Sequence, residues 1–228
     1  MPSISKKQMQ EYEQFIKDKA AGRILTPDGI RLVCAAFNNN PQEIGVHFLN
    51  LLTKYQSEGV FAHRFASCVF FWLNEGENGY LSNWFNSPFS VDGIKYANTE
   101  QYFMAQKAIL FGDTNTLEQI MKAESPKECK KLGRSVTPFD SVIWDTKCYD
   151  IMKTGNRQKF IQNPGLMTKL LSTGDAILAE ASPIDGIWGI KLDAEQADNI
   201  EPSKWPGRNL QGKLLMELRE EFRENFGN

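Results

Sequence analysis

A carboxylate and an amine that stand seven residues apart are the first candidates for chemistry in this chain. Glu100 and Lys107 belong to the segment Thr99–Lys107 (TEQYFMAQK), whose pattern predicts a helix capped by Thr99. Seven residues make two helical turns, so both side chains share one face, about 10.5 Å apart along the axis, with Phe103 between them. A partly apolar face can shift the pKa values of such groups, so that they act as acid, base or nucleophile. The alternative is an amphipathic helix whose charged edges are solvated.

The segment 179–189 (AEASPIDGIWG) combines two further carboxylates with an indole ring. Glu180 and Asp185 supply the carboxylates, and Trp188 offers a flat face that can stack on a planar group. The segment follows a predicted strand and is rich in turn-forming residues, as binding loops are. The alternative is a turn in which Asp185 caps its own backbone while Trp188 packs in the core.

Three shorter segments carry residues suited to polar or anionic ligands. Glycines in the segment 206–213 precede a predicted helix, so backbone N–H groups there can hold a phosphate beside Arg208 and Asn209; the alternative is a glycine-rich helix cap. Gly133–Arg134 can hold an anion, but an arginine at a helix C-terminus also matches the helix dipole. Ser82–Asn83 offers short polar groups, and turn capping explains them equally well.

The elements that must position these residues are more helical than extended. We expect strands at 69–73 and 176–181, and a hairpin at 89–96 that turns at Asp92–Gly93. Expected helices after the first one cover residues 114–123, 125–134 with a Ser125/Glu128 capping box, 141–161, 164–172 and 209–225. Residues 1–64 are expected to form an α/β extension, with a helix at 5–21, a strand at 30–37 and a helix from Pro41. The prediction is an α+β fold, divided into an extension (1–64) and a mostly helical domain with one pocket (65–228).

Composition excludes several classes of function. The chain has 228 residues, 41% of them apolar, and a formal net charge of −2, so it can bury a sizeable core and has no large cationic field. A local basic groove that contacts nucleic acid is still compatible with this charge. Only two histidines and four irregularly spaced cysteines are present, which argues against a zinc site or a disulfide framework. No apolar run is long enough for a membrane span or signal peptide, so we expect a cytoplasmic protein. Because the sequence shows no metal site, we expect no metal or cofactor, and we expect chelators to leave the activity unchanged.

Six motifs in the same order resemble the NADAR superfamily, the YbiA-like N-glycosidases. They cover about residues 68–224 and comprise Phe71-Trp72, Leu81-Ser82-Asn83-Trp84, Thr99 to Lys107, Gly133-Arg134 with Trp144 and Met152, Ile177 to Ser182 with Asp185 to Gly189, and Gly207-Arg208-Asn209 with Leu214 to Arg219. Three positions depart from the family pattern, since Gln101 stands where histidine is common, Asn98 sits near a usual proline and Gln211 replaces a common leucine. The stretch 190–205 is longer than in the family and acidic, so we expect it to form a lid or to narrow the substrate range.

The resemblance implies an enzyme that hydrolyses the N-glycosidic bond between a ribose and a base-like group. It places the catalytic residues at Glu100, Lys107 and Asp185, and it implies that a lysine amine forms a Schiff base with the opened ribose. The substrate-binding residues that it implies are Phe71, Trp72, Ser82, Asn83, Tyr102, Arg134, Glu180, Ser182, Trp188, Gly189, Gly207, Arg208 and Asn209. Among these, the aromatic rings can stack on the base, while Arg134, Arg208 and Gly207 can hold phosphate.

The substrate class remains open at this point. One branch of the family removes ADP-ribose from guanine bases, and another cleaves phosphoribosyl-pyrimidine intermediates of riboflavin synthesis. The altered insert at 190–205 and the extension at 1–64 indicate a specialised member of the family, which favours the first branch. A non-catalytic module that binds ADP-ribose or a nucleotide is the competing class, and it would not need Glu100, Lys107 and Asp185 together.

Overall fold

The structure is a computed structural model that describes residues 68–226. The predicted elements within residues 1–64 lie outside this range, and the division of the chain at residue 64 stays a prediction. The described unit, which contains all the motifs named above, is treated by itself.

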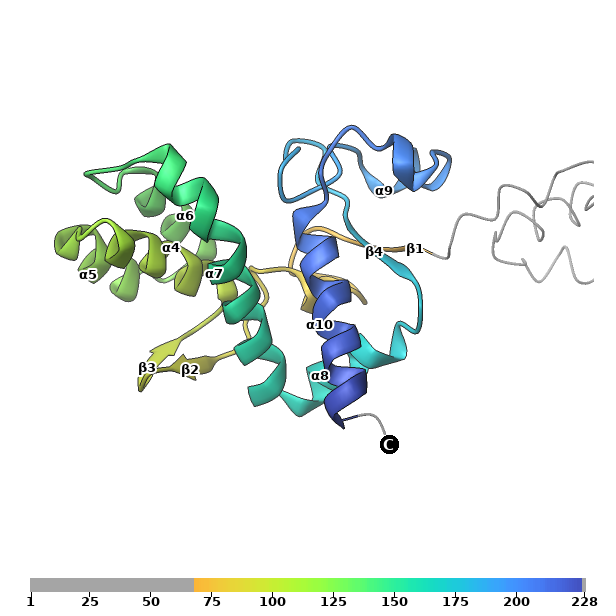
Figure 1. The fold of residues 1–228 in the computed structure, drawn as a ribbon, viewed down its shortest axis with the longest axis horizontal. Coiled ribbons are helices and arrows are strands. Elements are labelled where there is room, and N and C mark those ends of the chain that lie inside the picture. The colour runs from red at the N-terminus through yellow and green to blue at the C-terminus, as the bar shows by residue number, and fades with distance from the viewer. Residues whose placement is uncertain (1–67, 227–228) are drawn as a thin grey trace, which may run out of the picture. The chain divides into compact units, whose positions relative to one another are not determined.

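Helices dominate the described unit, which confirms the predicted α+β class with few strands (Figure 1). The α-helices are α4 (Thr99–Leu110), α5 (Thr114–Lys122), α6 (Pro126–Arg134), α7 (Ser141–Gln162), α8 (Pro164–Ser172), α9 (Ala194–Asp198) and α10 (Leu210–Phe226), with short 3-10 turns η2 (Gly79–Leu81) and η3 (Pro202–Lys204). Within residues 68–226, no helix has both the length and the apolar character that crossing a membrane requires.

The strands form two separate pairs. β1 (Cys68–Phe71) and β4 (Ile177–Glu180) run parallel, with Phe71 opposite Glu180. Because parallel strands end at the same edge, the residues that follow β1 and β4 emerge side by side, which is where ligands commonly bind. β2 (Phe89–Val91) and β3 (Ile94–Tyr96) form the predicted hairpin, and its turn residues Asp92 and Gly93 have φ values of 49° and 78°, as the turn requires.

Two helix caps differ from the predictions. The cap of α4 is Asn98 rather than Thr99, since the Asn98 side chain accepts a hydrogen bond from the Gln101 N–H at 2.9 Å. At α6, Ser125 Oγ accepts from the Glu128 N–H as predicted, but the Glu128 carboxylate accepts from the N–H of Glu124 instead of closing the box on Ser125. Both helices are still capped, so their starting points are well defined.

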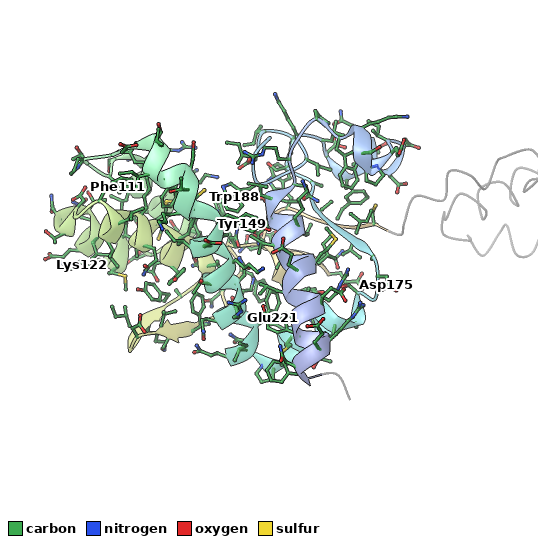
Figure 2. All side chains as sticks on the ribbon, viewed as in Figure 1. Phe111, Lys122, Tyr149, Asp175, Trp188 and Glu221 are labelled. Atoms are coloured by element: carbon green, nitrogen blue, oxygen red, sulfur yellow. The ribbon has the colours of Figure 1, made fainter. Side chains whose placement is uncertain are left out.

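Two apolar cores lie on either side of α7 (Figure 1). One is formed by α7, α8, α10 and the β1–β4 pair, and it includes Leu178 and Phe222. The other is formed around α4, α5, α6 and the hairpin, and it includes Tyr96 and Ile120. Polar contacts also join α7 to α10, because Arg157 pairs with Glu221 and Tyr149 donates to Glu217 at 2.9 Å, and Figure 2 shows Tyr149 and Glu221 at this junction.

The insert 190–205 packs against the β1–β4 pair. Its buried residues Ile190 and Ala197 join a small apolar cluster with Phe70, and the ring of Trp205 lies 6.0 Å from the Phe70 ring. No residue of 190–205 lines the cavity described below, so the predicted lid is not seen in this arrangement. The insert instead supports the strand pair from which Glu180 emerges.

Candidate functional site

A cavity of about 810 Å³ lies where β1, β4 and the start of α4 meet α6 and α7. This volume suits a ligand of nucleotide size. Nine of the predicted site residues line it: Trp72, Ser82, Asn83, Glu100, Arg134, Glu180, Ser182, Asp185 and Trp188. Seven do not: Phe71, Tyr102, Lys107, Gly189, Gly207, Arg208 and Asn209.

Two of the aromatic residues outside the cavity wall are core residues. Phe71 and Tyr102 are each 4% exposed. Tyr102 packs in the core around α4, with its ring 5.1 Å from the Tyr96 ring and 5.8 Å from the Phe89 ring. The rings that face the cavity are instead those of Trp72, Trp84 and Trp188.

The backbone before α10 does not form the phosphate cradle that its glycines suggest. The N–H groups of residues 207–211 donate in turn to the carbonyls of Ile190, Gly186, Gly189, Ile187 and Trp188, at 2.8–3.2 Å. The glycines allow this close packing, since a Cβ on Gly207 would lie 2.3 Å from the Gly189 carbonyl oxygen. The prediction that these N–H groups are free to bind phosphate is therefore wrong, and their role is to hold the loop that carries Asp185 and Trp188.

Asn209 joins α10 to β4. It adopts a left-handed conformation (φ 52°), and its side chain donates to Leu178 O at 2.9 Å and accepts from the Glu180 N–H at 3.1 Å. The Asn209 side chain thus bonds to the backbone of β4 as a neighbouring strand would. Asn209 therefore fixes the backbone of Glu180 from outside the cavity.

Both interpretations of the segment around Asp185 apply at once. Asp185 Oδ1 accepts from the N–H groups of Ile187 and Trp188, both at 2.9 Å, which is the turn that caps its own backbone. The carboxylate also lines the cavity, beside Trp188, whose ring meets the Phe103 ring edge-on at 5.4 Å. The turn therefore fixes the orientation of Asp185, and its second oxygen remains for a ligand.

Glu100 and Glu180 are the electrostatic centre of the cavity. Burial raises the pKa of Glu100 to about 7, with Asp185 adding to the rise while Lys130, a hydrogen bond with Trp84 and Arg134 oppose it. Burial likewise raises the pKa of Glu180 to about 8, with Asp185 and Glu100 adding to the rise and Lys130 opposing it. These two glutamates therefore exchange protons near neutral pH, and the charge of Asp185 contributes to the raised pKa of both.

One carboxyl oxygen of each glutamate has no protein partner. Glu100 Oε1 and Glu180 Oε2 are buried without a hydrogen bond. Such atoms are costly in a finished core, so in a cavity wall they indicate groups that a substrate satisfies. A site that holds charged carboxyls apart from water also suits the stabilisation of a positive centre.

The raised pKa of Glu180 predicts a stability cost that grows with pH. Below its ordinary value of 4.5 the group is protonated in both the folded and the unfolded chain, and it costs nothing. Between there and about 8 the unfolded chain ionises while the folded one does not, so stability falls. We expect Glu180→Gln to match the wild type at pH 4 and to exceed its free energy of unfolding by roughly 1–3 kcal/mol at pH 8.

Urea unfolding of both proteins at several pH values between 4 and 8 measures this difference. Glu118→Gln on α5 is a matched control, because the side chain of Glu118 is 74% exposed and away from the cavity. If the free energies of unfolding of Glu180→Gln and the wild type differed by the same amount at every pH, the raised pKa of Glu180 would be contradicted.

A row of cations on α6 also lines the cavity, and the sequence analysis did not single it out. Lys127, Lys130, Lys131 and Arg134 line the cavity at spacings of three, one and three residues, which places them along one helix face. None of the four lies within 4.0 Å of a carboxylate oxygen belonging to residues 68–226. The same spacing was visible in the sequence, but lysines on a short helix usually mark a solvated face. The other lining residues that the sequence analysis did not predict are Leu73, Trp84, Ser125, Glu128, Met152 and Ile184.

Lys107 does not line the cavity and lies next to α6. Its amine donates to Gly133 O at 2.8 Å and sits 4.2 Å from the Phe139 ring centroid and 5.5 Å from that of Trp144. Burial lowers its pKa, which increases the fraction of neutral amine. Trp144 packs on Phe103, which in turn meets Trp188, so an aromatic chain separates Lys107 from the cavity.

The departures at Gln101 and Gln211 are accommodated by hydrogen bonds, as is Asn98, which caps α4. Gln101 accepts from the Ala97 N–H at 2.8 Å and donates to Ile120 O at 3.0 Å. Gln211 pairs with Asn83 through bonds of 2.9 and 3.0 Å.

Among the described residues, no group of three or more His, Cys, Asp or Glu side chains is arranged to hold a metal ion.

Known proteins of similar sequence and structure indicate the family to which the chain belongs. The NADAR domain model matches residues 70–223. The chain is 49% identical over 146 residues to N-glycosidase R617 of Acanthamoeba polyphaga mimivirus, covering 62% of this chain and 86% of that protein. It is 31% identical over 157 residues to the riboflavin biosynthesis protein VVA0006 of Vibrio vulnificus, covering 69% of this chain but 39% of that protein. The NMR structure of the E. coli protein YbiA matches with a TM-score of 0.59 and 30% identity, over 70% of this chain and 87% of that one. The predicted family is confirmed: the chain belongs to the NADAR domain family.

Proposed function

We propose that this enzyme, a hydrolase of N-glycosyl compounds, removes ADP-ribose from ADP-ribosylated guanine in a nucleic acid or nucleotide. The observation that carries the proposal is that Glu100, Glu180 and Asp185 line one cavity together with four cations of α6. A ribose whose N-glycosidic bond breaks becomes positive, and a phosphate attached to it is negative. The carboxyl groups offer the complementary charge to the ribose, and the cations offer it to the phosphate.

The length of the cation row favours a diphosphate over a single phosphate. ADP-ribose carries two linked phosphates, whereas a phosphoribosyl-pyrimidine carries one on its ribose. The row from Lys127 to Arg134 extends over about two helical turns, about 10 Å, which exceeds the span of one phosphate. The exposed members of this row also suit contact with a nucleic acid backbone.

The carboxyl groups divide the chemistry between them. Glu100, with a pKa of about 7, is poised to give a proton to the departing nitrogen and then to take one from the attacking water. The Asp185 carboxylate, fixed by its turn, stabilises the positive charge on the anomeric carbon. Glu180, with a pKa of about 8, is protonated at neutral pH and donates a hydrogen bond to the substrate.

Lys107 is the proposed nucleophile if the sugar passes through a covalent adduct. Its amine attacks the anomeric carbon, the base departs with a proton, and ring opening leaves an imine that water hydrolyses. To reach the cavity, the amine must leave Gly133 O and pass Trp144. Lys130, which already lines the cavity, is the competing amine.

Reductive trapping decides between these two lysines. We expect that borohydride added during turnover reduces the imine to a stable secondary amine on Lys107, found by peptide mass spectrometry. Lys107→Arg keeps the charge but cannot form the adduct, so trapping should vanish in that variant. An adduct on Lys130 instead would move the nucleophile to α6.

Removing single cations from α6 is expected to weaken binding more than catalysis. Lys127→Ala and Lys131→Ala should each raise KM about three- to tenfold and leave kcat nearly unchanged, with KM rising further in salt. The matched control is Lys122→Ala on α5, because the side chain of Lys122 is 80% exposed and outside the cavity. Equal effects of all three variants would count against a phosphate site on α6.

A panel of substrates tests the proposed function. Purified protein is offered ADP-ribosylated guanine in single-stranded DNA, phosphoribosyl-pyrimidine intermediates of riboflavin synthesis, and NAD, each beside Glu100→Gln. We expect the highest kcat/KM on the first. Preference for the second would assign the protein to the reaction that the name of the Vibrio relative suggests. Tight binding without turnover of any would favour a nucleotide-binding module.

A further inference from the structure

A buried cluster of three amide side chains lies directly behind the catalytic wall. Asn83, Asn156 and Gln211 are 9%, 0% and 0% exposed. They come from the loop after η2, from the middle of α7 and from the first turn of α10. Buried amides need partners for both donors and acceptors, and here they find them in one another.

The hydrogen bonds of this cluster converge on Asn83. Its Nδ2 donates to Gln211 Oε1 at 3.0 Å, and its Oδ1 accepts from Gln211 Nε2 at 2.9 Å and from Asn156 Nδ2 at 3.1 Å. The Asn83 amide oxygen and one of its two N–H donors thus bind protein partners, although the residue lines the cavity. The Asn83 backbone in turn contacts the catalytic wall.

The Asn83 backbone holds the helix that carries Glu100. Asn83 O accepts from the Glu100 N–H at 3.1 Å, which is one of the first-turn donors of α4 that the helix itself leaves unpaired. The neighbouring peptide is also fixed, because the fully buried Lys159 donates to Ser82 O at 2.9 Å. Gly155 brings α7 close enough for these contacts, since a Cβ there would lie 2.5 Å from the Tyr102 ring.

We propose that Gln211 and Asn156 are positioning residues that act on catalysis through Asn83 and Glu100. They clamp the Asn83 side chain, and the Asn83 carbonyl sets where the first turn of α4 places the Glu100 carboxyl. Small displacements of a proton donor reduce rates strongly, so the clamp affects turnover without touching the substrate.

Gln211→Met tests the clamp, because methionine has a similar length but no amide. Hydrogen exchange of the Glu100 N–H, followed by NMR on the full chain, should accelerate about tenfold or more relative to that of Leu215 in α10. Leu218→Val, a buried change seven residues along the same helix, controls for general loss of stability. Asn156→Ala serves as the second variant if Gln211→Met does not fold.

Kinetics give a second readout, which rests on the proposed function for its substrate. We expect Gln211→Met to lower kcat about tenfold with KM nearly unchanged, and to have less than about a twofold effect when Glu100 is already Gln. Leu218→Val should act equally in both backgrounds. Unchanged exchange at Glu100, or additive kinetic effects, would overturn the proposal. If no substrate is turned over, the proposed function fails, and the exchange measurement still decides the clamp.

Discussion

Glu100→Gln is expected to lower kcat roughly a thousandfold on any substrate that the wild type cleaves. Glutamine fills the same space, but it can neither give up a proton nor carry a negative charge. The Glu100 carboxyl is buried at the cavity wall, and one of its oxygens has no protein partner. Steady-state kinetics near pH 7 measure the loss, and the pH dependence that belongs to a group of pKa about 7 should disappear with it.

The fold of this variant should be intact or more stable. The pKa of Glu100 is raised by burial from 4.5 to about 7, so folding stability falls as pH rises between these values, and Glu100→Gln removes that cost. Glu118→Gln, the exposed carboxyl on α5, provides the matched control and should retain full activity. If Glu100→Gln kept more than about a tenth of the wild-type kcat, proton transfer by Glu100 would have to be abandoned.

Asp185→Asn is expected to have the second large effect, lowering kcat roughly a hundredfold. Asparagine keeps an oxygen that can accept from the Ile187 and Trp188 N–H groups, so the turn and the position of Trp188 survive. What is lost is the negative charge beside the anomeric carbon. Kinetics and thermal unfolding of the same samples separate the loss of rate from any loss of structure.

Asp185→Ala provides the comparison that separates the two roles of this residue. It removes both the charge and the two hydrogen bonds, so we expect a further fall in kcat/KM together with a lower Tm. If Asp185→Asn were as active as the wild type and only Asp185→Ala were impaired, Asp185 would be a turn residue alone.

The sequence predicted the elements whose signals are local. Asp92–Gly93 marks a hairpin turn, and proline or a capping side chain marks the starts of α6 and α8, so these elements lie close to where they were expected. Glu100, Asp185 and Trp188 could also be singled out from the sequence, because acidic or aromatic residues in a turn or on a helix face stand out in a chain with few histidines, and all three line the cavity.

Features that depend on distant pairing could not be predicted in this way. The N–H groups of residues 207–211 seemed free until the loop 186–190 supplied their acceptors. The Asn83–Gln211 pair spans 128 positions, and nothing near either residue indicates it. The cations of α6 were visible as a row, but only the cavity shows that they share one site with the carboxyl groups of α4 and β4.

The most direct measurement is the identity of the products formed from ADP-ribosylated guanine DNA. Mass spectrometry of a complete reaction should find intact ADP-ribose and unmodified guanine in equal amounts, with neither formed by Glu100→Gln. That result would establish cleavage of the bond between ribose and base. Release of AMP, which would mean cleavage between the two phosphates while the ribose stays on guanine, would contradict the account.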